Sequence, residues 1–174
     1  MTSLPALPEP FGWRGGQIAA ELPGGHVRFT TRLGVAGSAP LDLQHWSDPA
    51  ACAALAAELE LPPARIAQSH QVHGTRVRAV VSEADLPAPA SDCDAQVTSM
   101  AGVACVGRTA DCLPIAVAAP EAVGAVHAGW RGLALGVVQA AVAELRRLGA
   151  TRISAAIGPG ARVCCYEVGE DVHA

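Results

Sequence analysis

The segments Cys105-Val-Gly-Arg-Thr-Ala-Asp-Cys-Leu-Pro-Ile115 and Val126-His-Ala-Gly-Trp-Arg-Gly132 decide both the fold and the chemistry of this chain. Apolar runs lead into Asp111-Cys112 and into His127, and both runs break at these polar residues. Functional side chains are commonly carried where strands meet loops. We therefore expect one buried strand to end in a thiol and another to end in an imidazole, with both side chains contributing to a reactive site.

The composition indicates a single domain with an aliphatic core. The chain has 174 residues, of which 51% are hydrophobic and only 3% are aromatic, so we expect one domain over residues 1–174. Charged residues make up 16%, and the net charge of −4 comes without any basic block. This distribution argues against a nucleic-acid partner. The oligomeric state stays open.

The termini and the cysteines favour a soluble protein in a reducing compartment. The six cysteines occur in a chain whose N-terminus lacks the features of a secretory signal, and this combination favours the cytoplasm. The apolar runs are far too short to cross a bilayer. We therefore expect a cytoplasmic protein that does not use the membrane as a partner.

Hydrophobic periodicity predicts strands interspersed with two helices. Strands of β-branched and small residues are expected over 26–32, 77–81, 103–106, 113–119, 123–126 and 153–157, with another one ending near Thr98. A first helix is expected over 50–59, after the start signal Ser47-Asp48-Pro49. A second helix is expected over 133–148, because its apolar residues recur every three or four positions and Gly149 suits a helix end.

Three polar side chains, His73, Cys112 and His127, form a candidate metal-binding set. Their spacing matches no compact zinc motif, and on pattern alone His70 is an alternative to His73. Two imidazoles and one thiolate suit zinc better than magnesium or calcium. Three protein ligands also leave a fourth position for water, whose pKa zinc lowers toward about 7. The set is therefore typical of a catalytic zinc site.

Two other interpretations of the same residues stay open at this point. Cys112 can be a buried small side chain and His127 a histidine satisfied at a strand end, and the residue pattern alone makes this about as good an interpretation as the metal site. Alternatively, Cys112 can act as a nucleophile without a metal. In that case His127 would be its base, and Asp111 or Asp94 would orient the imidazole.

Two arginines are candidate ligands for an anion. Arg131 follows the turn after His127, where small residues permit close approach and a helix begins. Its guanidinium is a bidentate donor for phosphate or carboxylate. Arg32 ends the first predicted strand, where a solvated arginine is the simpler interpretation on sequence pattern.

Five sequence blocks resemble the laccase-domain family, whose members are also called multicopper polyphenol oxidases, purine nucleoside phosphorylases and peptidoglycan editing factors. The resemblance runs from about Arg28 to the C-terminus. The blocks are Gln71-Val-His-Gly, Asp94-Ala-Gln-Val-Thr, Thr109-Ala-Asp-Cys-Leu-Pro-Ile, His127-Ala-Gly-Trp-Arg-Gly and Ile157-Gly-Pro with Cys164-Cys-Tyr-Glu-Val-Gly.

The resemblance implies a fold and a zinc site. The implied fold is α/β (α+β), with mixed sheets covered by helices, and is related to cysteine-hydrolase toxins. The implied zinc ligands are His73, Cys112 and His127, which favours His73 over His70. Arg32 matches an arginine of an early family motif, so the resemblance favours a functional role for it.

The resemblance also implies phosphorolysis of adenosine, inosine and methylthioadenosine, together with deamination of adenosine. Cys112, Asp111, Arg32 and Arg131 would then carry catalysis, with Asp111 moving a proton and the arginines holding phosphate. The partners are a nucleoside and phosphate. Competing functions are a cysteine or zinc amidase that edits cell-wall precursors, a copper polyphenol oxidase and a non-catalytic zinc protein. Copper is the less favoured metal, because six histidines are few for a multicopper cluster.

Two departures from the family pattern affect these expectations. Asp42 stands where family members have an asparagine near the site. The chain ends at His173-Ala174, where relatives continue, so the resemblance implies a single domain that lacks its C-terminal part.

Overall fold

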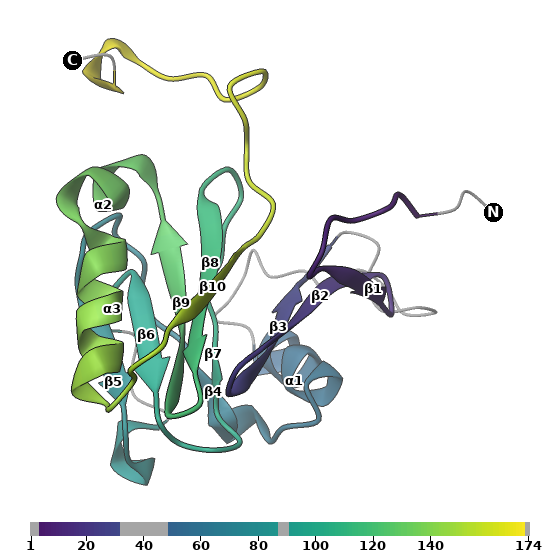
Figure 1. Cartoon of the computed structure of the whole chain (residues 1–174), viewed down its shortest axis with the longest axis vertical. Helices are drawn as coiled ribbons and strands as arrows, with labels where there is room; N and C mark the ends of the chain where they lie inside the picture. The colour runs from purple at the N-terminus through teal and green to yellow at the C-terminus, as the bar shows by residue number, and fades with distance from the viewer. Residues whose placement is uncertain (1–3, 32–48, 87–90, 173–174) are drawn as a thin grey trace.

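The computed structural model describes residues 4–31, 49–86 and 91–172, and its centre is a mixed five-stranded sheet (Figure 1). The strand order is β10-β8-β9-β6-β5. Only β5 and β6 are parallel, and the other adjacent strands of this sheet are antiparallel. The strands are β5 (Val77–Val80), β6 (Ala95–Thr98), β8 (Leu113–Ala119), β9 (Ala122–Ala128) and β10 (Ser154–Ile157). The predicted mixed α/β fold is confirmed, and so are the strands expected in these regions.

The β8–β9 hairpin places the start of one strand beside the end of the next. Its register pairs Leu113 with Ala128 and Pro114 with His127. The prediction that Cys112 ends a strand is wrong, because no strand is assigned between Cys105 and Leu113 and the thiol comes directly before β8. Since β8 and β9 are antiparallel, Cys112 and His127 still meet at one edge of the sheet.

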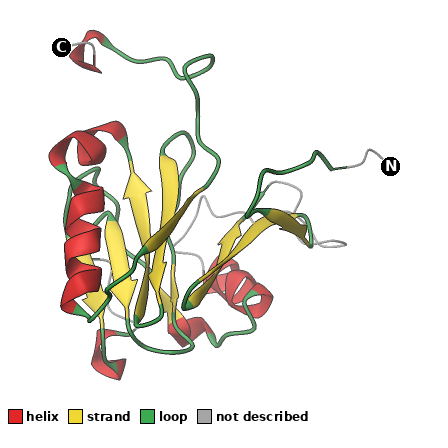
Figure 2. Ribbon diagram, in the orientation of Figure 1, coloured by secondary structure: helices red, strands yellow, loops and turns green. Residues whose placement is uncertain are grey.

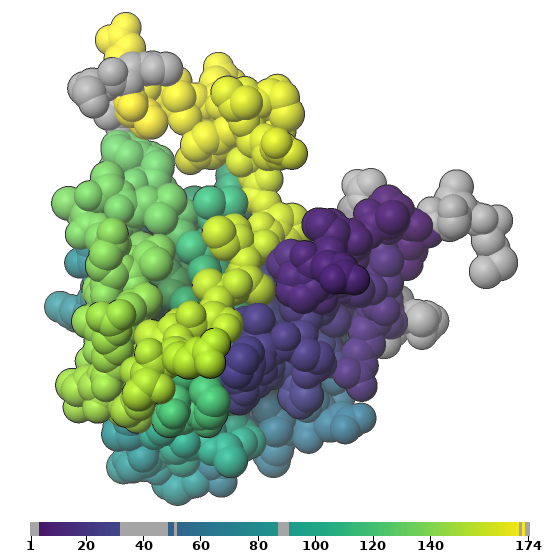
Figure 3. Space-filling model, viewed as in Figure 1, coloured from purple at the N-terminus to yellow at the C-terminus, as the bar shows by residue number. Residues whose placement is uncertain are grey.

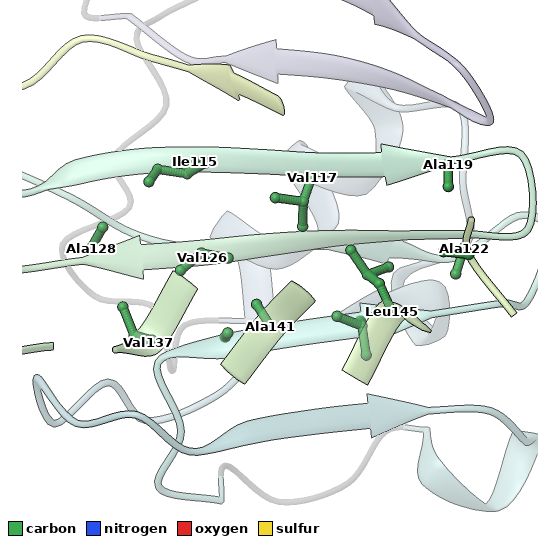
Figure 4. Close-up of a cluster of buried hydrophobic side chains, with 12 residues drawn as sticks. Ile115, Val117, Ala119, Ala122, Val126, Ala128, Val137, Ala141 and Leu145 are labelled. Atoms are coloured by element: carbon green, nitrogen blue, oxygen red, sulfur yellow. The ribbon is translucent and has the colours of Figure 1, made fainter. Parts of the chain in front are cut away.

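The main core lies between this sheet and helix α3 (Val137–Arg147). Side chains alternate between the two faces of a strand, so Ile115, Val117 and Ala119 all point from β8 toward α3, as Figure 4 shows. Val137 and Leu145 of the helix are fully buried against them. The cluster contains no aromatic residue, which confirms the expected aliphatic core.

A glycine divides the second predicted helix into two. Helix α2 (Trp130–Leu135) ends and α3 begins at Gly136, whose φ of 94° lies in the left-handed region. The single helix predicted over 133–148 is therefore wrong in its first turn. The break redirects the chain, so that α2 caps the edge where His127 lies while α3 packs on the sheet.

Gly136→Ala is expected to destabilise the protein by about 1 kcal/mol, because an L-residue is strained at a left-handed φ. Thermal or denaturant unfolding measures this loss. Gly12→Ala is the matched control, since its Cβ would meet nothing within 4 Å and its φ is not in the left-handed range. Equal stability of Gly136→Ala and wild type would contradict the assignment of the break to backbone conformation.

Two smaller sheets flank the central one (Figure 2). The N-terminal sheet consists of β1 (Gly12–Arg14), β2 (Gln17–Leu22) and β3 (Gly25–Phe29), and β4 (Ile66–Ala67) pairs in parallel with β7 (Ala104–Cys105). The N-terminal sheet (purple in Figure 3) meets β10, where Ala156 packs with Phe29. The sequence prediction missed β1 and β2, and the strand predicted over 26–32 ends at Phe29.

The first predicted helix is confirmed as α1 (Pro49–Glu58), whose buried Leu55 and Ala56 pack against Ile66. Its predicted start signal, Ser47-Asp48, lies outside the described residues. Short 3-10 turns occupy Pro63–Arg65, Glu83–Asp85 and Glu170–Val172. In the described ranges, each helix is too short or too polar to cross a bilayer.

Candidate metal centre

The side chains of His73, Cys112 and His127 converge at the edge of the sheet. One potential ligand atom from each residue lies within 4.8 Å of those of the other two. The Nε2 atom of His73 is 3.8 Å from the Sγ atom of Cys112, and the two imidazole rings meet edge to face with centroids 4.7 Å apart. Residues that are distant in the sequence thus form one compact cluster.

The separation of the His73 and Cys112 ligand atoms fits a tetrahedral zinc ion. With zinc–nitrogen and zinc–sulfur bonds of about 2.0–2.1 Å and 2.3 Å, a tetrahedral site separates these ligand atoms by about 3.6 Å. The distance between the His73 and Cys112 ligand atoms is 3.8 Å. His70 is engaged elsewhere, since its Nδ1 atom lies 2.9 Å from the Asp92 carboxylate. The structure therefore brings His73, and not His70, to Cys112 and His127.

The buried carboxylate of Asp94 connects the two histidine segments. Its Oδ1 atom accepts hydrogen bonds from the Nδ1 atom of His127 and the backbone N–H of His73, both at 2.8 Å. Its Oδ2 atom accepts from the backbone N–H groups of Gly74 at 2.7 Å and Val72 at 3.3 Å. Because Asp94 engages Nδ1 of His127, the Nε2 atom is the one available to a metal. A carboxylate behind a ligating histidine is a common arrangement in metal sites.

The hydrogen bonds to Asp94 keep its carboxylate ionised. Burial raises the pKa of Asp94, but the hydrogen bonds from His127 and from the backbone of residues 72–74 outweigh burial and bring the pKa below its ordinary value of 3.8. Its side chain has no exposed surface. The centre therefore contains a buried negative charge that favours an adjacent cation.

The electrostatic surroundings of Cys112 disfavour a free thiolate. Burial raises the pKa of the Cys112 thiol, and the negative charges of Asp111 and Asp94 raise it further. Catalytic cysteines that act without a metal normally show the opposite shift, because a nearby cation or helix dipole stabilises the thiolate. A bound cation would reverse the local balance and deprotonate the ligand.

Two backbone features allow the ligands to approach one another. His73 adopts a φ of 60°, which is unusual for a residue other than glycine. This conformation turns the chain so that three consecutive N–H groups point at Asp94. Gly129, directly after β9, supplies the space, because a Cβ atom there would lie 2.6 Å from Cδ2 of His73 and 3.2 Å from Sγ of Cys112.

Gly129→Ala is expected to weaken zinc binding at least about tenfold, because the added methyl group displaces the His73 ring from a site that tolerates about 0.5 Å of error. Competition with a chromophoric chelator measures the affinity. Gly107→Ala is the control, since its Cβ would meet nothing within 4 Å. Zinc affinity unchanged by Gly129→Ala would show that the ligands do not need their observed approach.

The remaining predicted site residues are not among the three convergent side chains. Asp111 is exposed beside Cys112, and its backbone carbonyl accepts the N–H of Ala161 at 2.9 Å. Arg131 is exposed in α2, and its guanidinium carbon lies 4.4 Å from the centre of the Trp130 ring. Arg32 and Asp42 lie outside the described residues, so their predicted roles remain predictions.

A large hollow opens in front of the three ligands. Its volume is about 1270 Å³, and its lining includes His73, Cys112 and His127 together with residues of β3, β8 and β9. Among the described arginines, Arg28 and Arg108 line the hollow and Arg131 does not. The hollow is large enough for a ligand of nucleoside size.

Comparison with known proteins shows what the chain is similar to. A family model described as multi-copper polyphenol oxidoreductase laccase matches residues 47–174. The chain is 42% identical over 166 residues to a Streptomyces griseus protein named purine nucleoside phosphorylase ORF3, with 86% of this chain and 66% of that protein covered. It is 37% identical over 129 residues to a protein of an unknown prokaryotic organism named adenosine deaminase RL5, with 68% and 49% covered.

A solved structure agrees with these matches. YlmD from Geobacillus stearothermophilus superposes with a TM-score of 0.77 at 30% sequence identity, and the match covers 95% of this chain and 70% of that one. The chain spans only part of its curated relatives: 66% of the length of the Streptomyces griseus protein and 49% of the length of adenosine deaminase RL5.

Proposed function

The chain belongs to the family of multi-copper polyphenol oxidoreductase laccases, and on that premise we propose that it is a zinc-dependent purine nucleoside phosphorylase that also deaminates adenosine. The observation that carries most weight is the convergence of His73, Cys112 and His127 within 4.8 Å at the wall of the large hollow. The relatives named purine nucleoside phosphorylase and adenosine deaminase support the choice of substrate class. Adenosine, inosine and methylthioadenosine are the proposed substrates.

Zinc at this centre would act as a Lewis acid and lower the pKa of a water molecule for attack on the purine ring. The residues of the chain then have separate tasks. Asp94 holds His127 in the tautomer that leaves Nε2 free and orients its ring. Asp111, exposed next to Cys112, is the proposed carrier of the proton that must move during deamination.

Phosphorolysis needs a site for phosphate and stabilisation of the departing base. We assign phosphate to Arg32 and Arg131, whose guanidinium groups are bidentate donors for phosphate oxygens. As the glycosidic bond breaks, positive charge develops on the ribose, and the bound phosphate anion stabilises it electrostatically. Arg131 must leave the face of Trp130 to take part, since the two side chains are stacked in this structure.

Copper is a weaker candidate for the metal. In the described part of the chain, the only group of three convergent histidine, cysteine or carboxylate side chains is His73, Cys112 and His127. Two further histidines are paired with carboxylates, His26 with Glu21 and His70 with Asp92. A multicopper cluster needs more ligands at one place than this centre offers.

A cysteine hydrolase acting on cell-wall precursors is the second candidate. The contact between Cys112 and His73 supports it, because 3.8 Å is close to the spacing of a thiol–imidazole pair. The raised pKa of Cys112 opposes it, since that shift disfavours the thiolate. Activity that survives complete chelation of metal would favour this alternative.

Metal analysis and product identification test the proposed function together. We expect about one zinc ion per chain, inosine from adenosine without phosphate, and adenine with ribose 1-phosphate when phosphate is added. Removal of zinc with a chelator should abolish both reactions, and added zinc should restore them. Absence of bound metal, or turnover that is indifferent to metal removal, would contradict the proposal.

A further inference from the structure

The side chain of Gln71 clamps the backbone of a distant residue at both of its polar groups. Its Nε2 atom donates to the carbonyl oxygen of Arg108 at 2.7 Å, and its Oε1 atom accepts from the N–H of Arg108 at 2.8 Å. The amide thereby imitates the paired hydrogen bonds of a neighbouring β-strand. The two residues are separated by 37 positions in the sequence, so this clamp fixes tertiary structure.

The clamped segments carry two of the three candidate ligands. Gln71 is two residues from His73. Arg108 lies in the connection between β7 and β8 that carries Cys112, where no regular structure supports the chain. At the start of that connection, the N–H of Val106 donates to Ala67. The Gln71 clamp supports the connection between this anchor and the thiol.

Gln71 and Asp94 together join the three ligand segments. Asp94 binds His127 through its side chain and His73 through its backbone, so it connects the two histidine segments. Gln71 connects the His73 segment to the Cys112 segment. A metal site depends on such supporting hydrogen bonds, because ligand positions must be held within about 0.5 Å.

We propose that Gln71 is a positioning residue of the metal centre, which sets the separation of the His73 imidazole from the Cys112 thiol. The inference rests on the proposed metal-dependent function and extends it to a residue that would not touch the ion. It predicts a specific effect on metal affinity, whereas a purely structural clamp would affect only the stability of the fold.

The test compares two glutamine substitutions in the full chain. Gln71→Met keeps the length of the side chain but removes both hydrogen bonds. Gln139→Met makes the same chemical change at an exposed position of α3. The zinc dissociation constant is measured by chelator competition, the absorption of the cobalt(II) form reports ligand geometry, and thermal unfolding reports the fold.

We expect Gln71→Met to weaken zinc binding by roughly 10–100-fold, as is usual when a residue that orients a metal ligand is removed. The thiolate-to-cobalt absorption band should shift or weaken, while Gln139→Met should match wild type in both readouts. Gln71→Glu keeps the acceptor for the N–H of Arg108 and should fall between wild type and Gln71→Met. This second variant serves as the test if Gln71→Met does not fold.

Two results would overturn the inference and are distinguishable from each other. If wild type binds zinc and the folded Gln71 variants bind it within about twofold of wild type, Gln71 does not position the centre, although the proposed function stands. If wild type itself binds no zinc, the proposed function fails and the inference fails with it.

Discussion

Cys112→Ser is expected to weaken zinc binding by about 100–1000-fold and to abolish nucleoside turnover. A hydroxyl group does not ionise at neutral pH and is a much poorer zinc ligand than a thiolate. Four-ligand structural zinc sites bind with roughly 10–16 kcal/mol, or about 2.5–4 kcal/mol per ligand. Each tenfold change in affinity corresponds to about 1.4 kcal/mol, so the loss of one ligand lowers the zinc affinity by roughly two to three orders of magnitude. Chelator competition and product analysis from adenosine measure the two effects.

Cys164→Ser is the matched control for this substitution. Cys164 is exposed and is not one of the three convergent side chains. It should therefore bind zinc and turn over adenosine like wild type, which separates loss of a ligand from general loss of a thiol. Full activity and normal zinc content in Cys112→Ser would rule out the proposed centre.

Much of the central sheet could be predicted from sequence, because its strands are short runs of β-branched and small residues. The run over 113–119 coincides with β8, and the run over 123–126 is the middle of β9. The break at Gly136 could not be predicted from periodicity, since the apolar spacing continues across it and only the backbone φ reveals it. The sequence pattern does not reveal β1 and β2, because β1 has only three residues and β2 contains a single β-branched residue, Ile18.

The candidate site was only partly predictable for a similar reason. The sequence pattern indicates Cys112 and His127 and leaves His70 and His73 as alternatives, of which the family resemblance favours His73. The structure brings His73, Cys112 and His127 together. The hydrogen bonds that hold them depend on tertiary contacts that no local pattern encodes. The sequence offers Asp94 only as a partner of a metal-free catalytic histidine, and the Gln71 clamp joins residues 37 positions apart, which no local pattern links.

Cys112 lies near His127, as expected, but not for the reason that the sequence suggests. Sequence placed the thiol at the end of a strand, where functional residues are frequent. The structure places it before β8, and the antiparallel register of β8 with β9 brings it to the same edge as His127. Strand direction thus determined the outcome, and direction cannot be derived from apolar runs alone.

Asp94→Asn is expected to lower both the stability of the protein and its affinity for zinc. The carboxylate has no exposed surface and accepts hydrogen bonds from His127 and from three backbone N–H groups of residues 72–74. An amide turns its NH₂ group toward at least one of these donors, which leaves buried polar groups unpaired. Leaving a buried polar group unpaired typically costs about 1–3 kcal/mol, and loss of a carboxylate behind a ligating histidine weakens metal binding by about 10–100-fold.

Asp92→Asn is the matched control, because Asp92 is exposed and pairs only with the exposed His70 in the contacts observed for its carboxylate. Denaturant unfolding of the metal-free proteins isolates the stability effect from zinc binding. The pH dependence gives a second criterion, since the pKa of Asp94 lies below 3.8 in the folded protein. A carboxylate with a lowered pKa stabilises the fold fully above its unfolded pKa of about 4 and loses this contribution as the pH falls through the folded pKa. The stability difference between wild type and Asp94→Asn should therefore be constant near neutral pH and shrink below about pH 4. A difference that does not change over this range would show that the ionised carboxylate is not what holds the two histidine segments together.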